Sequence, residues 1–212
     1  MAQKQLHSAV SEDALNALKL ADQDLARLID QVPSRPFVEI ASYESTFHAL
    51  GRSIVYQQLA GKAAATIYGR VKSCLGGRLD AERLLATAPS ELRAAGLSNN
   101  KMLALQDLAT WQTQGRLPSR IALDAMDDEQ VIAKLVGIRG VGRWTAQMLL
   151  MFWLQRPDVW PAGDFGVRKG YALLKRLEPM PDAKSFIPMG NDYRPYRSFA
   201  AWYMWRATEL LD

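Results

Sequence analysis

The chain of 212 residues is long enough for one large domain or two small ones, and its hydrophobic fraction of 49% is ordinary for a globular protein. No apolar run approaches the roughly 20 residues of a membrane span, and the N-terminus lacks the apolar segment of a secretory signal. The single cysteine, Cys74, excludes internal disulfides and Cys-based zinc or iron–sulfur sites. Because His7 and His48 are the only histidines, we expect neither a His-rich metal site nor a Ser-His-Asp triad. We expect no metal and no cofactor.

Apolar residues recur at helical spacing along nearly the whole chain. Pro33 and Pro36 end the first expected helix, and Gly61 separates the second from the third. Ser90 and Gly96 flank the fourth as N-cap and C-terminal glycine. The predicted helices cover residues 11–32, 43–60, 62–75, 88–96, 97–115, 127–136, 143–155, 164–177 and 197–210. Since no alternating strand pattern interrupts them, the sequence predicts an all-α fold.

The formal net charge of +4 is unevenly distributed. Residues 1–133 hold 14 Lys/Arg and 15 Asp/Glu, whereas residues 134–206 hold 12 Lys/Arg and 5 Asp/Glu, a net charge of +7. The same basic segment carries 13 of the 19 aromatic residues. Interleaved basic and aromatic residues suit a nucleic acid, although a solvated basic face over an aromatic core is the simpler explanation from composition alone.

Three glycines, Gly137, Gly140 and Gly142, lie within the stretch GIRGVG, directly before an apolar helical segment. Two helices joined by this tight turn would form a helix–hairpin–helix. Gly140 and Gly142 can take positive φ and let another backbone approach closely. The N–H groups at the start of the second helix would form an anion site, suited to a DNA phosphate held without sequence preference. An ordinary tight turn between helices would explain a Gly-x-Gly pair by itself.

The longer string LVGIRGVGRWTAQMLL resembles the helix–hairpin–helix DNA glycosylase superfamily, and within it the DNA-3-methyladenine glycosylase II group. The matching positions are Leu135, Gly137, Ile138, Gly140, Gly142, Trp144, Thr145 and Ala146, followed by Asp164 in DVWPAGDFGVRKG. Two further blocks agree, RSIVYQQLAGKAA at 52–64 and YRPYRSFAAWYMW at 193–205. In the second block Tyr193 and Tyr196 stand where the family usually has tryptophan.

The resemblance extends over about residues 40–210 and implies two helical lobes that flank a DNA-binding cleft. We expect one lobe to comprise roughly residues 45–155, with the hairpin at 137–142. The other would combine residues 1–44 with 156–212.

Asp164 lies 22 residues after Gly142, at the expected start of a helix, where aspartate is a common N-cap. The resemblance implies that it is also catalytic. Hydrolysis of an N-glycosidic bond builds positive charge on the sugar, which a buried carboxylate beside C1′ would stabilise while it orients or deprotonates the attacking water. An alkylated purine is already cationic, so no second acid is needed. Asp158, the nearest carboxylate in sequence, is expected to be a surface charge.

An enzyme of this family takes the damaged base out of the stack. Gln58 matches the residue that fills the vacated space, and an exposed polar residue at a helix end is the alternative. Gln57, which precedes it, is expected to be structural.

The same resemblance implies that the main chain at Gly140, Gly142 and Thr145 holds the phosphate backbone near the lesion. Lys169 and Lys101 are candidate phosphate contacts, and for Lys101 a solvated surface position is the simpler expectation.

Trp144 and Trp205 match tryptophans of the family's base pocket, where indole faces attract a cationic base by about 0.5–2 kcal/mol. Met148 and Tyr56 are further candidates for this pocket, and core packing explains both equally well. In lyase-type members a lysine at the position of Trp144 attacks C1′, so its absence implies a monofunctional enzyme. Such an enzyme would excise bases of the 3-methyladenine and 7-methylguanine type and initiate base excision repair.

The expected partner is double-stranded DNA that contains alkylated bases, with no membrane association. We expect a monomer, in the cytoplasm with the nucleoid in a bacterium or in the nucleus of a eukaryote. A non-catalytic helix–hairpin–helix DNA-binding module is the main alternative, but Asp164 facing a polyanion would weaken its binding. A helical protein-interaction domain would leave GIRGVG and the basic segment unexplained.

Overall fold

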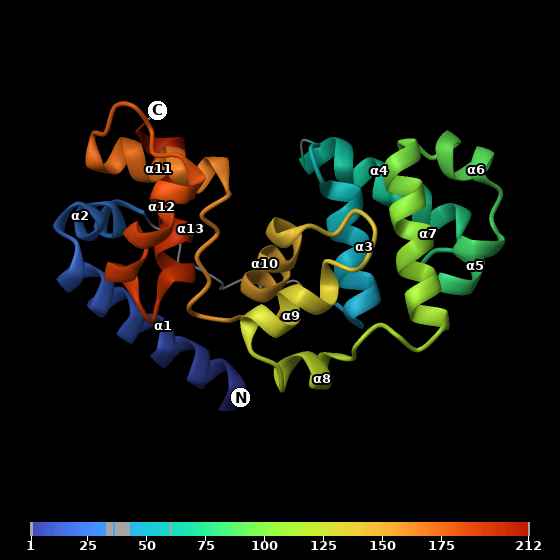
Figure 1. Cartoon of the computed structure of the whole chain (residues 1–212), viewed down its shortest axis with the longest axis horizontal. Coiled ribbons are helices and arrows are strands. Elements are labelled where there is room, and N and C mark those ends of the chain that lie inside the picture. The colour runs from blue at the N-terminus through green and yellow to red at the C-terminus, as the bar shows by residue number, and fades with distance from the viewer. Residues whose placement is uncertain (1, 33–35, 37–42, 60, 212) are drawn as a thin grey trace. The chain divides into compact units, whose positions relative to one another are not determined.

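The computed structural model describes residues 2–32, 36, 43–59 and 61–211, and within these ranges every regular element is helical (Figure 1). The predicted all-α class is therefore confirmed. The chain divides into two compact units: unit 1 comprises Met1–Ile40 and Gln155–Asp212, and unit 2 comprises Ala41–Leu154. Among the described residues no helix is both long and apolar enough to span a membrane.

Unit 2 contains the hairpin and packs its helices around a leucine-rich core. Its helices are α3 (Thr46–Tyr56), α4 (Gly61–Cys74), α5 (Ala81–Ala86), α6 (Pro89–Ala94), α7 (Asn99–Thr113), α8 (Arg120–Asp124), α9 (Asp128–Leu135) and α10 (Arg143–Phe152). Leu50, Ile54 and Leu105 are fully buried where α3 meets α7. Burial of such side chains contributes about 1.5–3 kcal/mol each and supplies most of the unit's stability.

Unit 1 is built from both ends of the chain. Its helices are α1 (Ala2–Ala21), α2 (Gln23–Gln31), α11 (Phe165–Lys175), α12 (Ala183–Met189) and α13 (Arg197–Leu210), with a 3₁₀ turn at Asn191–Tyr193. Helices α11 and α13 pack very closely. A Cβ at Gly170 would lie 1.8 Å from the carbonyl oxygen of Met204, so only glycine permits this approach.

The single helix predicted over residues 11–32 is wrong, because α1 ends at Ala21 and α2 begins at Gln23. Asp22 breaks the chain between them in an extended conformation, and its carboxylate caps α2 by accepting from the N–H groups of Asp24 and Leu25. Lys175 and Tyr193 also donate to this carboxylate, at 2.5 and 2.7 Å. Only 7% of Asp22 is exposed, so these contacts fix the break in the interior of unit 1.

Several short helices were not predicted, and one predicted cap is wrong. Helices α5, α8 and α12 span 6, 5 and 7 residues, too few for a periodic pattern to stand out. At α6 the N-cap is Ala88 rather than Ser90, because Pro89 occupies the first helical position, which it favours. The predicted role of Pro33 lies outside the described residues.

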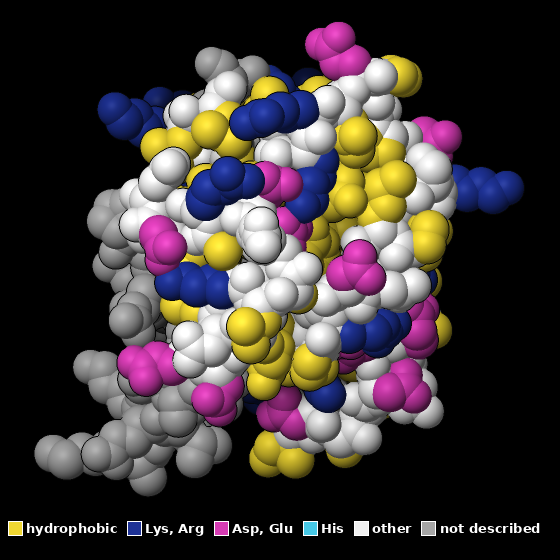
Figure 2. Space-filling view, turned by 90° about the vertical axis from the view of Figure 1, so that its left-hand side faces the viewer, with side chains coloured by type: hydrophobic (Ala, Val, Ile, Leu, Met, Phe, Trp, Pro, Cys, Tyr) yellow, Lys and Arg dark blue, Asp and Glu magenta, His cyan; other side chains and the backbone are white. Residues whose placement is uncertain are grey.

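Some of the Lys and Arg residues in 134–206 form ion pairs with acidic residues of their own unit. Lys175 pairs with Asp22 and Asp24 in unit 1, and Arg143 pairs with Glu129 in unit 2. Figure 2 shows one face of the molecule, where Lys and Arg side chains alternate with acidic and hydrophobic ones. The basic excess of the sequence therefore does not by itself mark a uniform basic surface.

Candidate DNA-binding and catalytic sites

The hairpin between α9 and α10 is anchored by its apolar residues. Ile138 and Val141 are buried, and each N–H donates to the carbonyl three residues earlier, at 3.0 Å in both cases. Gly140 has a φ of +77°, as the sequence predicted, and a Cβ there would lie 2.7 Å from the Cβ of Ala104 on α7. The turn thus needs glycine for its backbone conformation and for its packing.

Gly142 behaves differently from the prediction. Its φ of −89° and ψ of 175° are accessible to any residue, because it is the N-cap of α10 and takes the extended conformation that precedes a helix. As a glycine, Gly142 has no side chain with which to cap this helix end, and a Cβ added there would have open space around it within the described part of the chain. The start of α10 therefore offers open space at the positive end of a helix dipole, which suits an anion.

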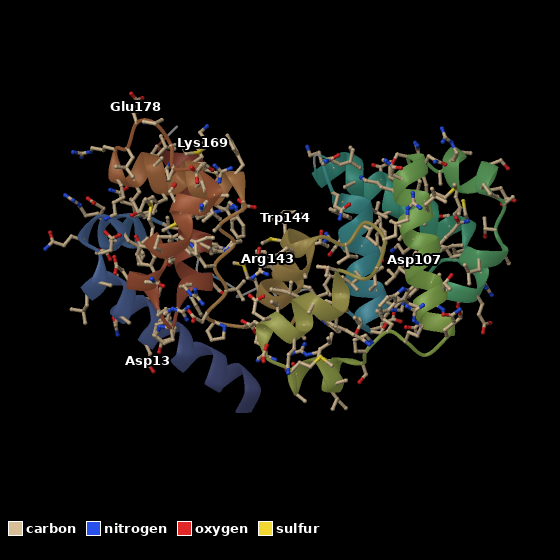
Figure 3. All side chains as sticks on the ribbon, in the orientation of Figure 1. Asp13, Asp107, Arg143, Trp144, Lys169 and Glu178 are labelled. Atoms are coloured by element: carbon tan, nitrogen blue, oxygen red, sulfur yellow. The ribbon has the colours of Figure 1, made fainter. Side chains whose placement is uncertain are left out.

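The first turn of α10 presents two exposed side chains, Arg143 and Trp144 (Figure 3). Trp144 is 43% exposed, which is high for an indole. Thr145 instead is buried, and its Oγ1 accepts a hydrogen bond of 3.0 Å from Nε2 of Gln57. Met148, one turn further along α10, is half-buried.

The turn that follows α3 is attached directly to the hairpin. Nε2 of Gln57 donates to the carbonyl of Gly140 at 3.0 Å as well as to Thr145, so the expected structural role of Gln57 is confirmed. Gln58 is exposed and has a φ of +56°, in the left-handed region that non-glycine residues seldom occupy.

Lys101 is not the solvated surface residue expected from the sequence. It projects from the first turn of α7, and its Nζ donates to the carbonyls of Val55 and Gln57 at 2.7 and 2.6 Å. These carbonyls belong to the end of α3, whose last turn lacks intrahelical donors. Lys101 therefore caps α3 across unit 2.

Tyr56 is half-buried at the end of α3 and packs within unit 2. The guanidinium carbon of Arg52 lies 3.8 Å from the centre of its ring, and the ring of Tyr68 meets it edge-on at 6.2 Å. These contacts account for its position by packing, the alternative left open from the sequence.

Asp164 is the N-cap of α11, as its sequence position predicted, and only 8% of it is exposed. Its Oδ1 accepts from the N–H of Val167 at 2.8 Å and from Nε1–H of Trp205 at 2.9 Å. A Cβ at Gly166 would lie 2.8 Å from Cδ1 of Trp205, so the glycine lets the indole reach the carboxylate. The structure thus brings Asp164 and Trp205 together in unit 1, and Trp205 orients the carboxylate, a role the sequence did not reveal.

The loop that leads to Asp164 is fastened to the start of α13. Asp158 is a partly exposed loop charge, as the sequence suggested, but it is held by two arginines: Nε of Arg197 reaches its Oδ1 at 2.6 Å and Nη1 of Arg194 reaches its Oδ2 at 2.7 Å. Ser198, fully buried, donates to the carbonyl of Arg156 and accepts from the N–H of Val159. The YRPYRSF block therefore positions the loop, although its partners lie about 40 residues earlier and no local pattern marks them.

Lys169 lies on the second turn of α11, half-buried, five residues after Asp164 (Figure 3). In an α-helix, two residues five positions apart differ by about 140° of rotation about the helix axis, so they do not share a face. Lys169 and Asp164 are therefore placed on different sides of α11.

Comparison with known proteins places this arrangement in a family. Residues 52–186 match the HhH-GPD superfamily of base excision DNA repair proteins. DNA-3-methyladenine glycosylase 1 of Schizosaccharomyces pombe is 34% identical over 197 residues, which cover 90% of this chain and 85% of that protein. The chain therefore belongs to the HhH-GPD superfamily of base excision DNA repair proteins.

Solved structures agree with this assignment. The S. pombe 3-methyladenine DNA glycosylase in complex with abasic DNA superimposes with a TM-score of 0.84 and 32% identity, and covers 93% of this chain and 97% of that one. A DNA-3-methyladenine glycosidase from Bacillus halodurans gives a TM-score of 0.76 and 34% identity, over 92% of this chain and 88% of that one. The helical fold is thus that of DNA glycosylases of this superfamily.

Proposed function

We propose that the protein is a monofunctional DNA glycosylase that removes bases of the 3-methyladenine and 7-methylguanine type from double-stranded DNA. The observation that carries the proposal is Asp164, a buried carboxylate whose Oδ1 is held by two donors. A relative named DNA-3-methyladenine glycosylase 1, 34% identical over 90% of this chain, supports the substrate class.

In this mechanism the carboxylate of Asp164 faces the sugar of the flipped nucleotide. Breakage of the N-glycosidic bond leaves positive charge on the sugar, and the fixed negative charge stabilises it. The same carboxylate orients the water that attacks C1′ and accepts its proton. The alkylated base already carries a positive charge, so it departs as a neutral molecule without an acid to protonate it.

DNA binding is proposed to use the start of α10. The backbone at Gly140, Gly142 and Thr145 would receive a phosphate, since the open N-terminus of the helix attracts an anion. Gln58, exposed on its left-handed turn, would fill the space left by the flipped base. Lys169, in unit 1, is proposed as a further phosphate contact.

Trp144, Met148 and Tyr56 in unit 2, and Trp205 in unit 1, are each proposed to contact the flipped base. An exposed indole such as that of Trp144 offers its face to a cationic purine. Because an indole nitrogen has no basic lone pair, Trp144 cannot form a Schiff base with C1′. The reaction should therefore stop at an intact strand with an abasic site.

The direct test uses a panel of duplexes, each with one defined lesion, followed by treatment with hot alkali. We expect cleavage at alkylated purines only after alkali, and no covalent adduct when borohydride is present during turnover. A non-catalytic DNA-binding module would bind these duplexes without base release. A robust borohydride-trapped adduct would refute the monofunctional assignment and leave glycosylase activity standing.

A further inference from the structure

The backbone at Gln58 is held in an unfavourable conformation on a surface turn. Its φ of +56° lies in the left-handed region, and a non-glycine residue there costs of the order of 1–3 kcal/mol. Such a conformation persists only where the surroundings impose it. The residues that impose it can be identified from the hydrogen bonds that precede Gln58 in the chain.

Two side chains hold the residue immediately before Gln58. The ammonium group of Lys101 binds the carbonyl oxygen of Gln57 at 2.6 Å and that of Val55 at 2.7 Å. The side-chain amide of Gln57 binds the carbonyl of Gly140 and the hydroxyl of Thr145, both at 3.0 Å. The main chain of Gln57 is therefore tied to α7 and its side chain to the hairpin.

The bonds made by Lys101 are charge-assisted, and such bonds are roughly twice as strong as neutral ones. The lysine is partly withdrawn from water, and this burial lowers the pKa of its ammonium group. An ordinary surface lysine gains little free energy by holding one side-chain conformation. Lys101 instead exchanges part of its hydration for hydrogen bonds to two backbone oxygens. Together with Gln57 it makes one rigid assembly of the turn, α7 and the hairpin.

We infer that Lys101 and Gln57 are positioning residues that hold Gln58 ready for insertion into the duplex and fix its place relative to the phosphate-binding hairpin. This inference rests on the proposed function of Gln58 and the hairpin. Ordering a free loop on binding would reduce affinity, and a turn that is already ordered avoids this cost. Phosphate binding at the hairpin then places Gln58 at one defined distance along the strand.

The test measures a selectivity ratio: the affinity for a duplex with a tetrahydrofuran abasic-site analogue, divided by the affinity for the undamaged duplex. An inserted plug adds affinity only where a base is missing, so the ratio isolates insertion from phosphate binding. Lys101→Met removes both clamping bonds, and Gln57→Ala removes the bonds to the hairpin. Lys72→Met, which removes a lysine charge from the last turn of α4, is the matched control.

We expect Gln58→Ala and Lys101→Met each to lower the ratio by roughly tenfold, the effect of losing one strong hydrogen bond. Lys72→Met should change affinity for both duplexes equally and leave the ratio intact. In a double-mutant cycle, Lys101→Met should have less than about a twofold further effect once Gln58 is Ala, because it acts through that side chain. Gln57→Ala should follow the same pattern, and it provides the test if Lys101→Met does not fold.

Fully additive losses in the cycle would overturn the inference, as would a ratio that Gln57→Ala and Lys101→Met leave unchanged. Because the ratio is a binding measurement, it is obtained whether or not the protein releases a base. Coupled losses in a protein that excises nothing would contradict the proposed activity and support the positioning role. Normal base release together with additive losses in the selectivity ratio would support the proposed activity and contradict the positioning role.

Discussion

Replacing Asp164 with Asn removes the negative charge of the side chain but keeps an oxygen that accepts hydrogen bonds. The amide oxygen of Asn can accept from Val167 N–H and Trp205 Nε1–H as the present Oδ1 does, at 2.8 and 2.9 Å. Asn and Asp are equivalent N-caps, so α11 keeps its capped start. The interaction of the negative charge with the helix dipole is lost, which costs less than about 1 kcal/mol of folding stability.

The effect on catalysis should be much larger. A carboxylate about 4 Å from the charged sugar, at an effective dielectric constant of about 20, stabilises it by about 4 kcal/mol. Since each 1.36 kcal/mol changes the rate tenfold, loss of this interaction should slow base release by roughly a thousandfold. Affinity for undamaged duplex should persist or rise, because a negative charge near phosphates is removed.

Single-turnover excision of 3-methyladenine from a defined duplex measures this rate directly. Asp182→Asn is the matched control, because Asp182 caps α12 in the same unit by accepting from Lys184 and Ser185 N–H groups. The control should excise at the wild-type rate. If Asp164→Asn excises within about tenfold of wild type, the electrostatic argument is wrong. Equal losses in both variants would show a general effect of capping on unit 1.

Three further predictions follow from individual contacts. Trp205→Phe keeps the aromatic ring but deletes the donor to Asp164, and should slow excision by roughly tenfold with little change in melting temperature; an unchanged rate would show that this hydrogen bond does not contribute to catalysis. Gln58→Gly should be more stable to urea than Gln58→Ala by about 1 kcal/mol, because only glycine takes the left-handed backbone without strain; equal stabilities would contradict this. Burial alone would raise the pKa of Asp22, but the hydrogen bonds from Lys175 and Tyr193 outweigh it and hold that pKa below its ordinary value of 3.8. Its ionised form therefore stabilises the fold above about pH 4, and this contribution disappears as the pH falls through the lowered pKa. Urea unfolding of Asp22→Asn should accordingly differ from wild type most at neutral pH and least near pH 3, and a difference that does not vary with pH would refute the linkage.

The sequence determined those features that depend on residues close together in the chain. The helix predicted over residues 197–210 is α13 to the residue, because its apolar spacing is uninterrupted. Positive φ at Gly140 and the N-cap at Asp164 were also predicted, since turn and cap preferences act over a few residues. The family could be recognised for the same reason, because its motif is contiguous from Leu135 to Ala146.

Only the tertiary structure decided the features that join distant residues. Asp22 interrupts a segment whose apolar residues recur at helical spacing. Its hydrogen-bond partners Lys175 and Tyr193 lie 153 and 171 residues away, and they stabilise a buried carboxylate at that point. The hydrogen bond from Trp205 to Asp164 and the clamp of Lys101 on α3 span 41 and 44–46 residues. A sequence specifies which groups can donate or accept, but packing alone determines which of them meet, because burial makes each unsatisfied group costly and so selects the partners.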